Sequence, residues 1–362
     1  MMNNIKHLYI HVPFCNNICY YCDFCHRIYN TNLVSKWLNT ISIEIKDKCN
    51  DQYETIYIGG GTPSSLNINE LECLLSYIKP YSKNVIEYTI EVNPDSLDID
   101  KINLFKKYGI NRVSMGVQSS NDEELLFLNR KHSFVDVKNK IKLLKENNIT
   151  NISIDLLYSL PNQTMQILDK TLNDFLSLEI PHVSIYSLTI EENSVFGKKG
   201  ISSLDSDIEA DMYEHIVSKL NDNGYQRYEV SNFCLPGFES RHNVGYWKYD
   251  DFLGISLSSS SKIGNLRYTI TSSFDEYFND YNSCQEKIVL SYDDLKFENI
   301  MMSLRLNDGL NINEFNNKYN CDLLNEYKDN ILMCKDLVAI KDDYFKCTNL
   351  ELLNKVLVNF LK

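Results

Sequence analysis

The sequence lacks any long hydrophobic run, since no stretch approaches the ~18 apolar residues of a membrane-spanning helix. Its first residues show no signal-peptide pattern, and its 11 cysteines, an odd and scattered number, do not form a disulfide framework. Positive charge is the minority, with 36 Lys and Arg against 49 Asp and Glu. We therefore expect a cytoplasmic protein without a nucleic-acid partner, whose membrane contact is at most peripheral, at the inner face, or through a partner.

The order of predicted elements indicates the fold. Short β-branched runs alternate with longer segments of helical spacing. Such alternation implies right-handed crossovers and a parallel sheet, so we predict an α/β fold with an incomplete (β/α)6 barrel. The expected strands are residues 8–12, 55–58, 87–92, 112–117, 152–157 and 182–188, and the expected helices are residues 32–48, 67–78, 98–108, 121–129, 134–147 and 164–178.

The pattern changes after the barrel. A long helix is expected at 206–223, and helices with two apolar runs, 337–340 and 344–347, follow further on. Helix, helix, hairpin and helix resemble a winged helix, which we interpret as a lid or docking module. The predicted domains are a barrel over 1–225, a connecting segment over 226–290, and a mainly helical, winged-helix-like domain over 291–362.

Three cysteines are the most informative feature. Cys15, Cys19 and Cys22 stand in the run HVPFCNNICYYCDF, and three thiolates on one short loop can hold three irons of a 4Fe-4S cube. Zinc is the alternative, with Cys25 and His26 close by, but structural zinc takes four ligands, typically as paired sets. The CxxxCxxC spacing is the one that radical S-adenosylmethionine (SAM) proteins use to bind SAM at the open iron. The motif thus predicts a 4Fe-4S cluster and SAM as cofactors.

Polar and glycine residues stand at the expected strand ends, where a barrel assembles its site. Gly59, Gly60 and Gly61 let backbone groups approach a ligand closely, although a glycine run can also be only a tight turn. The other residues of this kind are Glu91, Gln118, Arg130 and Asp155. Gln118 and Asp155 suit ribose hydroxyls, and the fork of Arg130 suits a carboxylate. A helix cap for Asp155 and a surface ion pair for Arg130 remain open alternatives.

Taken together, several segments carry a family resemblance. GGGTPS, EVNPDS, GVQSSNDEELLFLNRKHS, DLLYSLPNQT and SIYSLTIE, with Tyr9, His11 and the cysteines, resemble the oxygen-independent coproporphyrinogen III oxidase-like radical SAM proteins over nearly the whole chain. The resemblance implies that Cys15, Cys19 and Cys22 bind the cluster. It also implies a SAM site lined by Tyr9, Tyr21, Gly60, Gly61, Thr62, Glu91, Gln118, Arg130 and Asp155.

The family divides into two branches. Oxidases resemble CxxxCxxCxC with an additional N-terminal arm, whereas this chain has Phe24 at the fourth cysteine position and only eight residues before Tyr9. The haem chaperone branch carries HNxxYW, present here from His242 to Trp247. A single His in a loop is more often a satisfied polar residue, but imidazole is a common haem ligand, and Tyr246 and Trp247 offer flat apolar faces. The resemblance therefore implies haem as a third ligand, with His242 on its iron.

The expected function follows from this branch. The chain is predicted to be a haem chaperone that binds a 4Fe-4S cluster, SAM and haem and passes haem to client haem proteins, some of them at the membrane. It would be a carrier without coproporphyrinogen oxidase activity, and would need an electron donor such as flavodoxin or ferredoxin only if SAM is cleaved. The alternative is an oxygen-independent coproporphyrinogen III oxidase of porphyrin biosynthesis.

One segment departs from the pattern. Chaperone relatives carry a glycine-alanine segment that ends in His after the motif, whereas this chain has serines from Ser256 to Ser261, with Ser260 at the expected His position. A second ligand or proton donor is thereby lost, and another residue such as His215 or Cys234 could replace it. Cys25 is expected to be a spare thiol.

Overall fold

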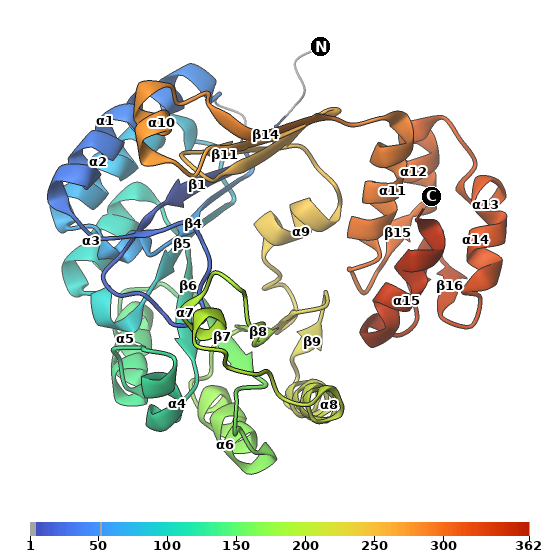
Figure 1. The fold of residues 1–362 in the computed structure, drawn as a ribbon, viewed down its shortest axis with the longest axis horizontal. Coiled ribbons are helices and arrows are strands. Elements are labelled where there is room, and N and C mark those ends of the chain that lie inside the picture. The colour runs from blue at the N-terminus through green and yellow to red at the C-terminus, as the bar shows by residue number, and fades with distance from the viewer. Residues whose placement is uncertain (1–4, 51–52, 362) are drawn as a thin grey trace.

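A computed structural model describes residues 5–50 and 53–361. One large sheet dominates, in the order β14-β13-β12-β11-β1-β4-β5-β6-β7-β8-β10-β9. Its six central strands pair in parallel, and β1 and β8 are not neighbours, so the sheet curves without closing (Figure 1). The prediction of an incomplete (β/α)6 barrel is confirmed.

The barrel strands and helices alternate as the sequence predicted. The strands are β1 (His7–Val12), β4 (Thr55–Gly60), β5 (Glu87–Val92), β6 (Arg112–Gln118), β7 (Asn151–Tyr158) and β8 (His182–Ser187). The helices are α1 (Thr31–Lys48), α2 (Ile68–Ile78), α3 (Ile99–Tyr108), α4 (Asp122–Phe127), α5 (Phe134–Glu146), α6 (Met165–Leu176), α7 (Val195–Lys198) and α8 (Ser206–Asp222).

Local chemistry sets the helix ends. Asn67 and Ser133 begin α2 and α5 with capping boxes, in which side chain and backbone satisfy each other's hydrogen bonds. Gly109 ends α3 in the left-handed conformation that glycine adopts without strain. These signals lie within the sequence itself, which is why the predicted helices fall close to the observed ones.

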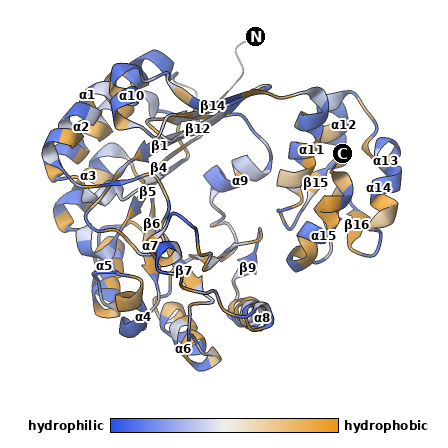
Figure 2. Cartoon of the chain, viewed as in Figure 1, coloured by the Kyte–Doolittle hydropathy of each residue, from blue (hydrophilic) through white to orange (hydrophobic). Residues whose placement is uncertain are grey.

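The two faces of the barrel strands differ in polarity. On β1, Leu8, Ile10 and Val12 point into the main core between sheet and helices, which surround the sheet in Figure 1. The alternate residues point into the barrel and are mostly polar, as Thr55 and Tyr57 are on β4. Hydrophobic residues form stripes on surrounding helices such as α6 (Figure 2). The apolar packing that stabilises the barrel therefore lies between the sheet and the helices. The barrel interior can accordingly hold polar side chains.

Residues 226–290 extend both edges of the sheet. β9 (Gln226–Arg227) and β10 (Asn232–Cys234) continue it beyond β8. Beyond β1 follow β11 (Phe252–Ile255), β12 (Ser260–Ile263), β13 (Leu266–Ile270) and β14 (Cys284–Val289), and α10 (Phe274–Asn279) lies between the last two in the chain. The strands β12 to β14 were not predicted, because β14 is largely exposed and has no clear apolar alternation.

The HNxxYW motif forms a helix, α9 (Arg241–Trp247), where the sequence analysis placed it in a loop. The expectation of a loop was wrong because the helix start depends on a distant carboxylate as well as on its local cap, Ser240, whose hydroxyl accepts from the Asn243 N–H. The Glu87 carboxylate accepts the backbone N–H groups of Arg241 and His242, each at 2.9 Å. A glycine at position 245 weakens the local helix signal further. In Figure 1, α9 lies between the sheet and the C-terminal helices.

The C-terminal part has its own hydrophobic core, which includes Ile300, Phe315 and Phe345. It is mainly helical with a small three-stranded sheet, and the two predicted apolar runs form a hairpin. Its elements are α11 (Tyr292–Ser303), β15 (Leu310–Asn311), α12 (Ile312–Tyr319), α13 (Leu323–Glu326), α14 (Lys328–Met333), β16 (Val338–Lys341), β17 (Tyr344–Cys347) and α15 (Leu353–Leu357).

Among the helices of residues 5–50 and 53–361, none has both the length and the hydropathy required to cross a membrane.

Candidate functional site

A cavity of about 510 Å³ opens at the carboxyl ends of the barrel strands. Most of the residues implicated by the sequence line it together, although they come from six different segments of the chain. Those that line it are Cys15, Cys19, Tyr21, Cys22, Gly60, Gly61, Thr62, Glu91, Gln118, Arg130 and Asp155. A (β/α) barrel places its active site at this end because the loops after the strands converge there.

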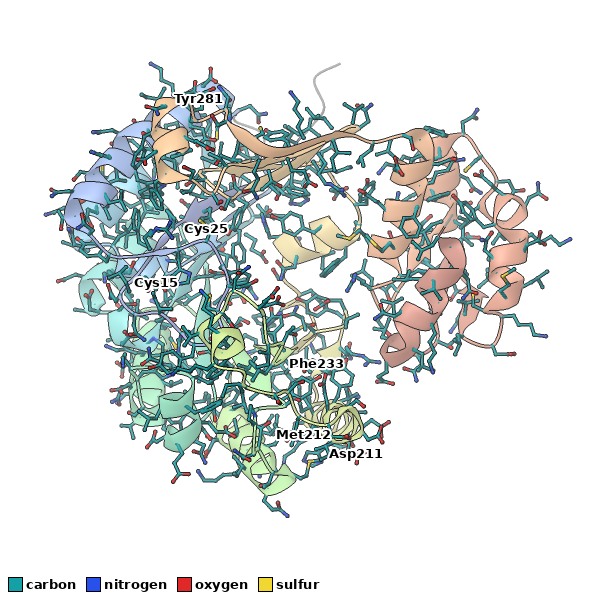
Figure 3. All side chains as sticks on the ribbon, viewed as in Figure 1. Cys15, Cys25, Asp211, Met212, Phe233 and Tyr281 are labelled. Carbon is teal, nitrogen blue, oxygen red and sulfur yellow. The ribbon has the colours of Figure 1, made fainter. Side chains whose placement is uncertain are left out.

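The loop that carries the three cysteines is anchored at both ends. The short strands β2 (Phe14–Cys15) and β3 (Arg27–Ile28) pair in parallel and close its base. Its middle is held by the turn after α4, where Tyr20 N–H donates to Leu128 O and Asn129 Nδ2 donates to Ile18 O. The three thiols are thereby kept at one side of the cavity. Figure 3 labels Cys15 within the barrel part of the molecule.

The thiols sit in contrasting surroundings. Burial raises the pKa of Cys15 to about 11 and that of Cys22 to about 12. Cys19 Sγ instead accepts a hydrogen bond from Nη1 of Arg130 at 3.3 Å. Since thiolates are the ligands of iron-sulfur clusters, cluster binding would release protons from Cys15 and Cys22.

The glycine loop packs directly against the cysteine loop. Gly61 N–H donates to Val12 O, and Thr62 N–H donates to Phe14 O at 2.7 Å. A Cβ at Gly61 would lie 2.7 Å from that same Phe14 oxygen, so only glycine fits here. The Thr62 hydroxyl donates to Cys15 Sγ at 3.4 Å. These contacts hold the end of β4 against the first cysteine.

Glu91 on β5 and Asp155 on β7 both face the cavity, with β6 between their two strands. Burial raises the pKa of Glu91 to about 7, against hydrogen bonds from Tyr57 and the Gly60 N–H that favour its ionised form. Burial also raises the pKa of Asp155 to about 6, and the nearby Arg112 cation opposes that rise. A bound cation or hydroxyl group would stabilise the ionised form of both carboxyls. Shifted pKa values of this kind are common among functional-site residues.

Gln118 and Arg130 carry polar atoms that the protein leaves unmatched. Gln118 has φ 68, a strained conformation for a residue other than glycine, at an irregularity in the pairing of β6 with β7. Its buried Oε1 and the buried Nε of Arg130 have no hydrogen-bond partner among the described residues. Such orphaned groups at a cavity wall fit a ligand that would complete their hydrogen bonds.

Asn93 was missed by the sequence analysis. It lines the cavity just after β5 and joins two predicted site residues: its Nδ2 donates to Thr62 Oγ1 at 3.1 Å, and its Oδ1 accepts from Arg130 Nη2 at 2.7 Å. The segment EVNPDS is part of the family resemblance, and the predicted site includes its Glu91 but not its Asn93. A polar residue directly after a strand was the available signal.

The donor set fits a cluster and SAM. Three thiols share the cavity with the carboxyls of Glu91 and Asp155, an arginine and an orphaned amide oxygen, and its volume of about 510 Å³ lies within the usual range of ligand pockets. Cys15, Cys19 and Cys22 would hold the cluster, while the carboxyls and Arg130 match the amino and carboxylate groups of SAM. Tyr9 is not one of the described residues that line the cavity, and its hydroxyl lies 3.0 Å from His11 Nδ1.

The predicted haem residues lie at the other end of the barrel. His242 is 1% exposed, its Nδ1 is 2.7 Å from the hydroxyl of Thr55, the first residue of β4, and its Nε2 is 2.8 Å from the Tyr246 hydroxyl. Burial lowers the pKa of His242 well below its usual range, so the ring is neutral. Both ring nitrogens are occupied, and iron could bind only if one hydrogen bond opened. Trp247 packs under Arg305 of the C-terminal part, 5.4 Å from its guanidinium.

The serine segment and Cys25 lie outside the cavity lining. Ser256 follows β11 and accepts a hydrogen bond from Trp37 Nε1, and Ser260 on β12 lies 2.8 Å from the Thr269 hydroxyl. Cys25 Sγ is 3.7 Å from Ser272 O, and Figure 3 labels this cysteine with Cys15 on the barrel. Ser256 thus joins the end of β11 to α1, and Ser260 joins β12 to β13.

Phe24 lines the cavity although its side chain is 67% exposed. Its position in the lining and its exposure place it at the rim. An aromatic ring therefore occupies the rim at the position where the oxidase pattern has a further cysteine.

The alternative ligands considered from the sequence lie elsewhere. His215 pairs with Asp169 at 2.8 Å between α8 and α6, and Cys234 is buried on β10. Neither residue is among the described residues that line the cavity.

Comparison with known proteins agrees with this geometry. Residues 9–175 match the Radical SAM superfamily, and residues 290–353 match the HemN C-terminal domain. A protein of Lactococcus lactis named "Heme chaperone HemW" is 37% identical over 91% of this chain and 89% of its own length. The protein of that name from Bacillus subtilis is 38% identical, over 73% of this chain and 72% of its own length.

The structural comparison covers almost the whole chain. Coproporphyrinogen III oxidase (HemN) from Escherichia coli, described as a radical SAM enzyme, matches with a TM-score of 0.86 over 99% of this chain and 90% of its own. At 21% sequence identity this match shows the fold alone. The fold, the cavity and the sequence relatives together lead to one conclusion: the chain belongs to the HemW heme chaperone family of radical SAM proteins.

Proposed function

We propose that this protein is a haem chaperone that binds a 4Fe-4S cluster and SAM in the barrel cavity and passes haem to client haem proteins. The observation that carries the cofactor part is the convergence of three cysteine thiols with Glu91, Arg130 and Asp155 around one cavity. The chaperone part is supported by the relatives named as heme chaperones, at 37% and 38% identity.

Each residue of the cavity has a proposed part. Cys15, Cys19 and Cys22 hold three irons, and the fourth iron stays open to SAM. Arg130 pairs with the SAM carboxylate, Glu91 with its amino group, and Gln118 and Asp155 with the ribose. When bound, the cluster supplies the electron with which radical SAM proteins cleave SAM, and an external donor would be needed only if this protein does so.

Haem is the proposed cargo, and the residues proposed to hold it are His242, Tyr246 and Trp247. Because both ring nitrogens of His242 are hydrogen-bonded, ligation through Nε2 requires the Tyr246 hydroxyl to move away. Because His242 and Tyr246 lie on the same helix, this bond opens by movement of the Tyr246 side chain, while the bond from His242 Nδ1 to Thr55 can keep α9 on the base of the barrel. His242 and Tyr246 therefore have opposite proposed roles. His242 ligates the iron, and the Tyr246 hydroxyl competes with the iron for Nε2.

We expect His242→Ala to weaken haem binding and alter the haem absorption spectrum, because the iron would lose its proposed protein ligand. Tyr246→Phe should keep the spectral signature, since it leaves the imidazole in place. A haem titration followed by absorption, on cluster-reconstituted protein, measures both. His215→Ala is the matched control, because this half-buried histidine pairs with Asp169 on the outer helices.

An unchanged spectrum and affinity in His242→Ala would refute ligation by this residue. The variant also leaves the Tyr246 hydroxyl without its partner inside the protein, which costs roughly 1 to 3 kcal/mol of stability, whereas Thr55 keeps His7 Nδ1 at 2.8 Å. A thermal melt must therefore show that it is folded at the temperature of the titration.

A further inference from the structure

Tyr57 connects the base of the barrel to Glu91, the carboxyl that is proposed to bind the SAM amino group. Tyr57 is the inward-facing residue of β4 that follows Thr55 by two positions. Its hydroxyl donates to Glu91 Oε1 at 2.8 Å, while Glu91 Oε2 accepts the Gly60 N–H at 2.9 Å. Both oxygens of the carboxyl are thus fixed, one of them by Tyr57.

The ring of Tyr57 contacts two other rings. Its centroid lies 6.2 Å from that of Tyr9 and 5.2 Å from that of His242, with an interplanar angle of 31° to the latter. A Cβ at Gly59 would lie 2.8 Å from Glu91 Cδ and 2.8 Å from Tyr57 Cε1. The absence of a side chain at position 59 is therefore what allows Tyr57 and Glu91 to meet.

We propose that Tyr57 is a positioning residue of the SAM site, whose hydroxyl fixes the Glu91 carboxylate for the SAM amino group and whose ring ties that carboxylate to the buried helix motif at His242. This inference rests on the proposed binding of SAM at Glu91. It assigns no contact between Tyr57 and SAM itself, because Tyr57 is not among the described residues that line the cavity.

Protonation of Glu91 makes the role measurable. Burial raises the pKa of this carboxyl to about 7, and the hydrogen bond from Tyr57 is the first influence that lowers it. The ionised form attracts the SAM ammonium group, so affinity should rise with pH through about 7, up to about pH 8, where the SAM amino group itself loses its proton. Removal of the Tyr57 hydroxyl should raise the pKa of Glu91 further, so the rise in SAM affinity should move to higher pH. Other groups that act on Glu91 are Tyr9 on β1, Arg112 on β6, Asp155 on β7, Tyr186 on β8 and Cys15 on the cysteine loop.

The test is SAM binding by calorimetry from pH 6 to pH 9, on anaerobically reconstituted protein. Tyr57→Phe keeps the ring and loses only the hydroxyl, so we expect roughly three- to tenfold weaker binding at pH 7 and a smaller loss at pH 9. Tyr88→Phe is the matched control, because this buried tyrosine on β5 has a hydroxyl without a partner among the described residues. Glu91→Gln cannot ionise and should bind SAM weakly with no step near pH 7.

The outcomes separate this inference from the proposed function. A Tyr57→Phe protein whose affinity and pH profile match those of the wild type overturns the positioning role while SAM binding stands. A step near pH 7 that persists in Glu91→Gln also overturns it, because the titrating group would then be another one. Wild-type protein that binds no SAM at any pH overturns both the inference and the function on which it rests.

Discussion

Replacing Cys15, Cys19 and Cys22 together with alanine is expected to abolish the broad iron-sulfur absorbance that anaerobic reconstitution gives to the wild-type protein. The three thiols are the ones that line the cavity, and a cluster without thiolate ligands is not retained. Iron and sulfide analysis with absorption spectra measures the loss. Air should bleach the wild-type cluster as well, because one of its irons is left open to small molecules.

Cys25→Ala provides the matched control for the triple variant. Its thiol lies 3.7 Å from Ser272 O and is not among the described residues that line the cavity, so the variant should keep the full absorbance. Equal loss in Cys25→Ala, or a cluster retained in the triple variant, would show that the ligands are assigned wrongly.

Arg130→Ala should lower SAM affinity roughly tenfold to a hundredfold without loss of the cluster. The reason is the removal of a charge-assisted contact to the SAM carboxylate, worth ~1.5 to 3 kcal/mol. Calorimetry with reconstituted protein measures the affinity, and the iron-sulfur absorbance checks the cluster. A loss of SAM affinity tests the contact to SAM only if the cluster is retained, because Arg130 Nη1 also lies 3.3 Å from Cys19 Sγ.

Lys131→Ala removes the same charge from the next position. Lys131 Nζ donates to Asn129 Oδ1 in an exposed contact, and exposed contacts of this kind contribute little. Its SAM affinity should therefore stay close to that of the wild type. If Arg130→Ala binds SAM as tightly as this control, Arg130 lies outside the SAM site.

The barrel could be predicted from the sequence because its signals are local. The strands carry an apolar residue at every second position toward the helices, as Leu8, Ile10 and Val12 do, and caps such as Asn67 mark helix starts. The cluster loop was predictable for a related reason: the cysteine spacing lies within eight residues of the chain.

What could not be predicted depends on pairs that are far apart in the sequence. The helix α9 begins where Glu87 accepts two of its N–H groups, more than 150 residues away. The roles of Tyr57 and Asn93 likewise depend on their hydrogen bonds to Glu91 and Arg130, respectively. The position of His242 against Thr55 belongs to the same class, and no motif spacing could indicate that its ring nitrogens are occupied.

The central claim is that the protein carries haem and does not convert a porphyrin precursor. The most direct measurement incubates reconstituted wild-type protein anaerobically with SAM and a reductant, once with haem and once with coproporphyrinogen III. Spectra after gel filtration and product analysis are then compared. We expect haem to remain bound and unchanged and coproporphyrinogen III to be recovered intact. Oxidation of its propionate side chains, with no haem retained, would contradict the chaperone assignment and identify the protein as an oxidase.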